Sequence, residues 1–178
     1  MNNLGKGLER WGRNFWEVYE FHRFVFIYSS IIMLLLLIGW SLLCYIKYRN
    51  RKSIWYLGYS ILFVLAITNL FRVPGTSLQY KPLPGWSYIE IIENKNIFLF
   101  FENLANVLVY FPVGYFCTRT LYGKKYFIVV MIILVPFFME LTQFLFRLGL
   151  FEWDDLFHNI LGEGLGFFCC KRYYKHSK

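Results

Sequence analysis

Charged residues are scarce in this chain of 178 residues, where they make up only 17% of the sequence. Soluble globular domains are nearer one quarter charged, so the composition argues against an ordinary cytosolic enzyme. Cysteine is scarce as well, and the four cysteines lie in or beside apolar runs without the spacing of a metal site or a disulfide scaffold. We expect these thiols to be reduced and to pack as small apolar side chains.

Apolar residues dominate what is present. They make up 57% of the sequence, aromatic residues make up 22%, and the mean hydropathy is +0.41. Such a composition excludes disorder and a collagen-like fibre. The sequence instead predicts a polytopic membrane protein, an all-α helix bundle that forms one integral membrane domain over residues 1–178.

Five apolar runs approach the roughly 20 residues that cross a bilayer as a helix. We expect about five transmembrane helices, at residues 24–46, 54–71, 103–119, 126–146 and 155–170. Before them, apolar residues at helical spacing predict an amphipathic N-terminal helix over residues 4–22, lying in the membrane interface. Packing of this helix against the end of the bundle is the alternative.

Basic residues give the chain a net charge of +8 and cluster at residues 47–52, 119–125 and 171–178. The clusters lie between apolar runs and do not line one polar face, so we do not expect nucleic-acid binding. Five spans place all three on one side, which the positive-inside rule makes cytoplasmic, together with the C-terminus. The basic residues of the N-terminal helix would then lie outside. Either the three clusters outweigh them, or this helix lies elsewhere.

This topology brings polar residues of the last three spans to one depth. Glu140, Gln143 and Arg147 fall on one helical face, and Asp155 and Asn159 begin a stripe on the next helix. A charge in a membrane costs roughly 2.5–3.5 kcal/mol, so spans turn such groups toward partners or water. We therefore predict an outward-facing polar cavity between the last three helices, with six ligand-binding residues: Asn106, Glu140, Gln143, Asp154, Asp155 and Asn159.

A purely structural role is the alternative for these groups. Glu140 could pair with Arg147, and Asn106 could bond to Asn159 across the bundle. Hydrogen bonds between helices in membranes are worth only ~0.6 kcal/mol on average, which favours a binding site over such cross-links. Asp154 or Asp155 could cap the fifth helix, where acids meet the positive end of the helix dipole.

Other residues of these helices are assigned to packing. They are Pro112, Gly114, Gly162 and Gly166, of which the last two form a GxxxG pair typical of close helix contacts. His158 lies off the polar stripe, and we expect it to pack or to face water. Glu163 lies at the edge of the stripe and either belongs to the cavity or pairs with a basic residue.

Three motifs carry a family resemblance: N-x5-P-x-G from Asn106, E-x-x-Q from Glu140, and D-x3-N-x2-G-x3-G from Asp155, with Gly149 before the last. Because these motifs occur in this order and at this spacing, the chain resembles the VanZ-like family of bacterial membrane proteins, over a region of about residues 78–168. Many members carry arginine after the glycine, where this chain has Leu150. The first acidic position of the turn is a glutamate where aspartate is usual.

The resemblance implies a multi-pass protein of the bacterial plasma membrane, related to a protein associated with resistance to the glycopeptide teicoplanin. One hypothesis is a non-catalytic envelope protein whose cavity binds a lipid, a lipid-linked precursor or the acyl tail of a lipoglycopeptide. The second is a membrane-embedded enzyme with Glu140 and Asp155 as catalytic candidates. Glu140 would be the base, and Asp155 with Asn159 would act as acid or bind a hard cation such as Mg²⁺. The sequence itself requires no cofactor.

Overall fold

The computed structural model describes residues 27–48, 51–70, 72, 79–81 and 83–176. This part of the chain is mostly helical, as the composition predicts. The amphipathic helix predicted over residues 4–22 lies outside the described residues, so that prediction stays untested.

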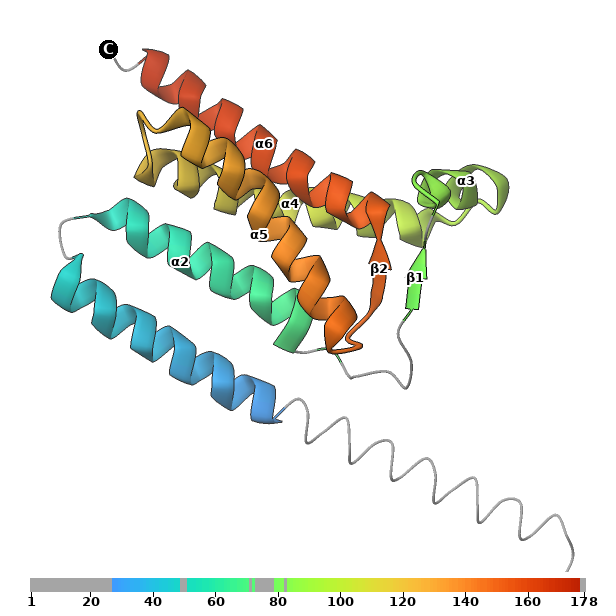
Figure 1. Ribbon diagram of the computed structural model, residues 1–178, viewed down its shortest axis with the longest axis horizontal. Helices are drawn as coiled ribbons and strands as arrows, with labels where there is room; N and C mark the ends of the chain where they lie inside the picture. Colours follow the sequence, from blue (N-terminus) through green and yellow to red (C-terminus); the bar gives the residue numbers. More distant parts are fainter. Residues whose placement is uncertain (1–26, 49–50, 71, 73–78, 82, 177–178) are drawn as a thin grey trace, which may run out of the picture.

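Four of the described helices are long and apolar enough to cross a membrane: Ile27–Lys47, Lys52–Leu70, Ile97–Thr120 and Lys125–Leu145. The second comprises α2 (Lys52–Leu65) and the π-helical turn η1 (Ala66–Leu70), and the others after the first are α4 and α5. A further long helix, α6 (Trp153–His176), packs along α4 (Figure 1). Its acidic residues and glycines lower its apolar content, so it is not among the four. The protein is therefore a membrane helix bundle, and a fifth crossing remains a prediction.

Two short strands add to the helical fold. β1 (Gln79–Lys81) pairs in parallel with β2 (Leu150–Glu152), so that the segment after α2 lies beside the segment that leads into α6 (Figure 1). Next to these strands, α3 (Trp86–Glu93) covers the end of the bundle at which the strands lie (Figure 1). Three-residue strands are too short to show the alternation of apolar and polar residues by which a strand is recognised in a sequence.

Glycines bring α4 and α6 into backbone contact. A Cβ atom on Gly114 would overlap the backbone carbonyl of Glu163, and one on Gly162 would overlap that of Val107. Gly166 meets the α4 backbone in the same way. Small residues allow this approach in membrane bundles, where packing takes the place of a hydrophobic drive between helices. Close packing of α4 on α6 is what fixes the polar side chains of the two helices relative to each other.

The other helices pack on this pair through apolar side chains. Val64 of α2 forms a buried core with Tyr110 and Val113 of α4. The helix Ile27–Lys47 adds Trp40, whose indole ring fills the space that Gly58 leaves on α2. The surface of the bundle remains strongly apolar, as a lipid-facing surface would be.

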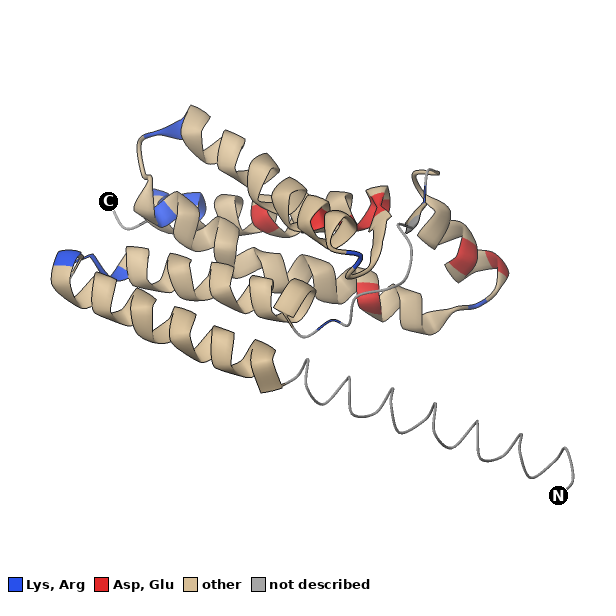
Figure 2. Cartoon of the chain, turned by 60° about the horizontal axis from the view of Figure 1, so that its bottom comes forward, with Lys and Arg blue, Asp and Glu red and all other residues tan. Residues whose placement is uncertain are grey.

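Charge is separated along the bundle. Most of the described lysines and arginines gather at one end, which carries the turn between the first helix and α2, the α4–α5 turn and the end of α6 (Figure 2). We call this the basic end. The described acidic residues lie in the middle of the bundle or toward the opposite end, which we call the acidic end. The described residues of the three basic clusters thus lie at the same end of the structure.

Candidate functional site

At the acidic end, α4, α5, α6 and the segment after η1 bring polar side chains together into what we call the polar cluster: Arg72, Asn106, Glu140, Gln143, Asp155 and Asn159. Several of them are withdrawn from the surface, since Glu140, Gln143 and Asn159 are at most 2% exposed. An ionisable group that is buried in a membrane bundle is costly and functional by default.

Hydrogen bonds connect the three helices within the polar cluster. The Asn106 amide of α4 donates to Asp155 Oδ1 of α6 at 2.7 Å. The Asn159 amide of α6 donates to Glu140 Oε1 of α5 at 3.1 Å. Each acid is thus paired with an amide of another helix. These pairs differ from the two cross-links considered from the sequence, Asn106 with Asn159 and Glu140 with Arg147.

Arg72 supplies the positive charge of the polar cluster, and sequence reasoning missed it. Its guanidinium donates to Gln143 Oε1 at 3.3 Å and lies within electrostatic range of Glu140 and Asp155. Gly149 leaves room for this group, because a Cβ atom there would come within 2.5 Å of the Arg72 Nη1 atom. The available signal was a lone basic residue directly after an uncharged span, on the side where the acids gather.

Arg147 does not take the place that helical spacing predicted for it. α5 ends at Leu145, and Arg147 follows in a turn with a φ of 57°, its side chain exposed. A helical face cannot be extended past the last helical residue, so Arg147 does not share one with Glu140. The arginine beside Gly149 is instead Arg72, which reaches it from another part of the chain.

Several buried polar atoms in and next to the polar cluster have no hydrogen-bond partner among the described residues. They include Glu140 Oε2, Asn159 Oδ1 and the Tyr110 hydroxyl. Both carboxylate oxygens of Glu163, one helical turn after Asn159, are in the same state. Buried polar groups are nearly always paired, so each unmade bond is a place for a ligand or water group. At Glu140, Asn159 and Glu163 the atoms without a partner are oxygens that accept hydrogen bonds. They therefore suit a ligand that carries donors.

The residues of the three sequence motifs thus meet along the α4–α6 contact and in the polar cluster. The chain also matches a protein-family model, VanZ/LLP1, over residues 26–174. This chain belongs to the VanZ/LLP1 family. No curated protein and no solved structure matches it. The matched region takes in α2 and Arg72, so the arginine of the polar cluster lies inside the VanZ/LLP1 region.

A second set of polar contacts holds α3 against the start of α6 in this VanZ/LLP1 protein. Asp154 accepts from the backbone N–H groups of Gly85 at 2.5 Å and Ser87 at 2.8 Å. Asp154 therefore caps α3, where the sequence suggested a cap on its own helix. The Asn103 amide donates to the Ser87 hydroxyl at 3.2 Å, which ties α4 to the same place.

Glu152 and His158 extend this contact between α3 and α6. Glu152 Oε2 accepts from the Trp86 indole N–H at 3.1 Å. Burial raises the pKa of the Glu152 carboxyl, and the indole hydrogen bond opposes that rise. His158 is buried, and its Nε2 atom lies 2.6 Å from the Tyr88 hydroxyl. Asp154, Glu152 and His158 therefore position α3 over the acidic end of the bundle.

The π-helical turn η1 places two more polar residues beside α5. Thr68 and Asn69 are buried, and the Thr142 hydroxyl of α5 donates to Asn69 Oδ1 at 3.2 Å. π-Helical turns are rare and frequent at functional sites, because they shift side chains out of the regular helical register. Within the described residues, no three His, Cys, Asp or Glu side chains form a group that could hold a metal ion.

Proposed function

We propose that this membrane protein acts in the bacterial cell envelope by binding a lipid or lipid-linked ligand at the polar cluster. The observation that carries the proposal is the pair of buried acceptors Glu140 Oε2 and Asn159 Oδ1, which have no partner among the residues that the structure describes and lie near the charge of Arg72. A ligand with hydroxyl or amide donors would complete these hydrogen bonds. The guanidinium of Arg72 has the two acids Glu140 and Asp155 nearby, which hold it in place at the edge of this site.

The separation of charge supports a location for this site. The basic end corresponds to the side that the positive-inside rule assigns to the cytoplasm, together with the C-terminus. The polar cluster would then face the extracytoplasmic side of the plasma membrane. That side carries the lipid-linked cell-wall precursors and receives lipoglycopeptide antibiotics, so the proposed orientation and the family both support a role in resistance to teicoplanin-type drugs.

Apolar surface around the site suits a ligand that carries a lipid. Leu104 and Leu108 of α4 and Phe157 of α6 are exposed large apolar residues within two sequence positions of members of the polar cluster, and they face outward from the same helical turns. A polar head group would enter between the helices while its chain stays in the bilayer. This division is the usual one for an amphipathic ligand, in which a few polar groups fix orientation and apolar contact supplies area.

An enzyme acting on the same class of ligand is the second candidate. One observation favours it: Asn159 holds Glu140 Oε1 at 3.1 Å, whereas Glu140 Oε2 has no partner in the described part of the chain. A carboxylate that is held at one oxygen and open at the other is arranged to take a proton from a bound substrate. Asp155, oriented by Asn106 at 2.7 Å, would act as the acid or, with Asn159, bind a hard cation.

Teicoplanin susceptibility of cells that express single variants tests both candidates. We expect Asp155→Asn and Asn159→Ala to lose resistance, because the first removes a negative charge near Arg72 and the second removes the amide that donates to Glu140. Glu140→Gln keeps the shape and removes the base, so it abolishes activity in an enzyme and weakens a binding protein only slightly. The matched control is Glu93→Gln, which makes the same change at an exposed acid of α3. Full resistance in all three site variants at wild-type protein levels would refute the site.

Cysteine labelling of intact cells tests the proposed orientation. A cysteine at position 93 on α3 should react with an impermeant maleimide added from outside, and one at position 175 should react only after the cells are opened. Both are placed in a variant whose native cysteines are replaced by serine or alanine. The opposite labelling pattern would turn the polar cluster toward the cytoplasm.

A further inference from the structure

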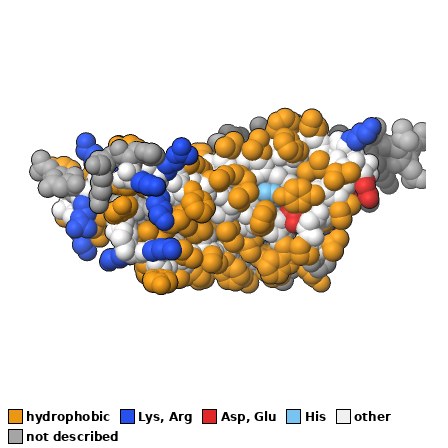
Figure 3. Space-filling model, turned by 90° about the horizontal axis from the view of Figure 1, so that it is seen from above, with side chains coloured by type: hydrophobic (Ala, Val, Ile, Leu, Met, Phe, Trp, Pro, Cys, Tyr) orange, Lys and Arg blue, Asp and Glu red, His pale blue; other side chains and the backbone are white. Residues whose placement is uncertain are grey.

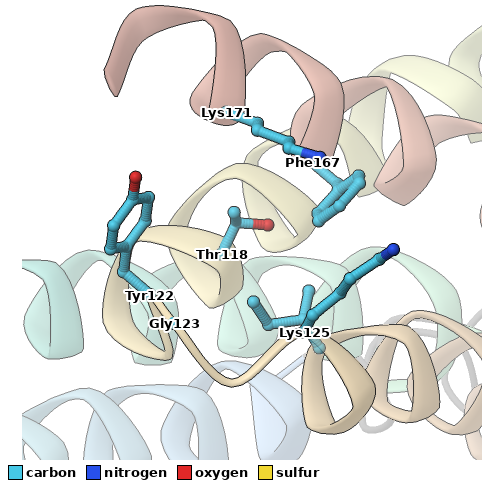
Figure 4. A pocket seen from close by; sticks show the side chains of 7 residues that line it. Thr118, Tyr122, Gly123, Lys125, Phe167 and Lys171 are labelled. Atoms are coloured by element: carbon cyan, nitrogen blue, oxygen red, sulfur yellow. The ribbon is translucent and has the colours of Figure 1, made fainter. Parts of the chain in front are cut away.

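A hollow lies at the basic end, at the other end of the bundle from the polar cluster. It has a volume of about 220 Å³ and lies between the α4–α5 turn and α6. Figure 4 shows Lys125 of α5 and Lys171 of α6 reaching toward the ring of Phe167 from opposite walls. Tyr122 and Ile128 complete the lining used below. We call this the lysine pocket.

The two lysines give the lysine pocket a strong positive charge. Lys171 Nζ lies 5.8 Å from the centre of the Phe167 ring. Figure 2 places the described acidic residues in the middle of the bundle and toward its opposite end, away from the described lysines and arginines of the basic end. The space-filling view shows further lysines and arginines gathered over the same end (Figure 3). An anion is therefore the ligand that the charge of this pocket favours.

The remaining lining is what a membrane-interface site requires. Tyr122 is the kind of amphipathic aromatic residue that gathers at head-group level. Phe167 and Ile128 present apolar walls below the lysines. Phe127 and Phe168, which follow in the chain beside the pocket, are 54% and 65% exposed on the outer surface. Acyl chains would thus continue directly from the pocket onto a lipid-facing surface.

From this arrangement we infer that the lysine pocket binds the phosphate head group of an anionic membrane lipid in the leaflet at the basic end. Lys125 and Lys171 take the phosphate from two sides, and the volume of about 220 Å³ accommodates the head group and its glycerol but not the chains. Basic pockets between transmembrane helices are a recurring way to bind such head groups. The site is independent of the polar cluster, because no residue belongs to both.

A lipid in this pocket would also connect elements that the chain joins only indirectly. Lys125 begins α5, and Lys171 lies in the last two turns of α6. One phosphate bound by both would hold the α4–α5 turn against the end of α6. Anionic lipid should therefore stabilise the folded protein as well as bind to it.

Native mass spectrometry and thermal unfolding of the purified protein test the inference. The protein in uncharged detergent is titrated with phosphatidylglycerol, phosphatidylcholine or inorganic phosphate. We expect phosphatidylglycerol to bind and to raise the unfolding temperature, and the other two to do so weakly. Loss of a direct charge-assisted contact from one lysine to the phosphate should cost at least about fivefold in affinity, so Lys125→Gln with Lys171→Gln should weaken phosphatidylglycerol binding about thirtyfold.

The matched control is Lys124→Gln with Lys175→Gln, which removes the same charge from neighbouring exposed positions outside the lysine pocket. We expect it to change affinity less than threefold. Equal weakening in the two double variants would show general attraction to a basic surface and overturn the inference. Inorganic phosphate that competes at the same concentration as the lipid would overturn the assignment to a lipid. If the double variant fails to fold, the single variant Lys171→Gln tests the inference, with an expected fivefold loss of affinity for phosphatidylglycerol.

Discussion

The packing of α4 on α6 makes a sharp prediction about two neighbouring glycines. Gly162→Ala places a methyl group against the backbone carbonyl of Val107, which is not a flexible group and cannot move aside. The helices must separate instead. Gly164→Ala is the matched control, because a Cβ atom at that position of α6 meets nothing within 4 Å.

The expected magnitudes follow from two opposing contributions. Replacing a helical glycine by alanine favours the helix by about 0.5–1 kcal/mol in both variants. Overpacking costs about 1–3 kcal/mol, and it applies only to Gly162→Ala. Helix propensity cancels between the two variants, so their difference isolates the steric cost. We expect Gly164→Ala to be slightly more stable than wild type and Gly162→Ala to be less stable than Gly164→Ala by about 1–3 kcal/mol.

The assay is thermal unfolding in detergent, followed by size-exclusion chromatography of the heated protein. A difference of 1 kcal/mol corresponds to about 2–4 °C for a chain of this size. Gly162→Ala should also weaken the polar cluster, because moving α6 away from α4 lengthens the Asn106–Asp155 hydrogen bond. Equal unfolding temperatures for the two variants would refute the close contact between α4 and α6.

Three further predictions concern the acidic end and the first helix. Asp154→Ala removes the acceptor of two backbone N–H groups of α3 and should cost about 1–3 kcal/mol, seen as faster hydrogen exchange in α3, with a smaller effect for Asp154→Asn. Gly149→Ala should displace the Arg72 guanidinium and lower teicoplanin resistance at an unchanged protein level; unchanged resistance would separate Arg72 from the function. Gly58→Ala should push Trp40 off α2 and lower the unfolding temperature, whereas Gly39→Ala, which meets nothing within 4 Å, should not.

The helical part of the fold was largely predictable, because apolar runs of spanning length are a strong signal. The predicted runs at 103–119 and 126–146 overlap α4 and α5. Membership of the VanZ-like family was predictable as well, from motifs that the match over residues 26–174 now supports. The two strands were not predictable, since their pairing depends on bringing residues 79–81 beside residues 150–152.

The polar cluster shows where sequence reasoning stops. Spacing along one helix placed Glu140 with Gln143, and Asp155 with Asn159, on common faces, and the structure brings these residues together. Spacing could not show that α5 ends before Arg147, nor which partner each amide takes across the bundle. Arg72 was missed for the same reason, because its contact with Gln143 depends on how two distant segments pack. The outward-facing cavity stays a prediction, since the residues expected to line it are mostly buried among the helices.

Photo-crosslinking from the site tests the central proposal most directly. Benzoylphenylalanine in place of Phe144, which follows Gln143 on α5, is irradiated in nanodiscs that contain a polyprenyl-diphosphate-linked cell-wall precursor. We predict an adduct with the precursor that is lost when Asn159→Ala is added, and no such adduct from the same photoreactive residue at Leu35, an exposed position near the middle of the helix Ile27–Lys47. Equal adducts from both positions, or an adduct that survives Asn159→Ala unchanged, would contradict a ligand site at the polar cluster.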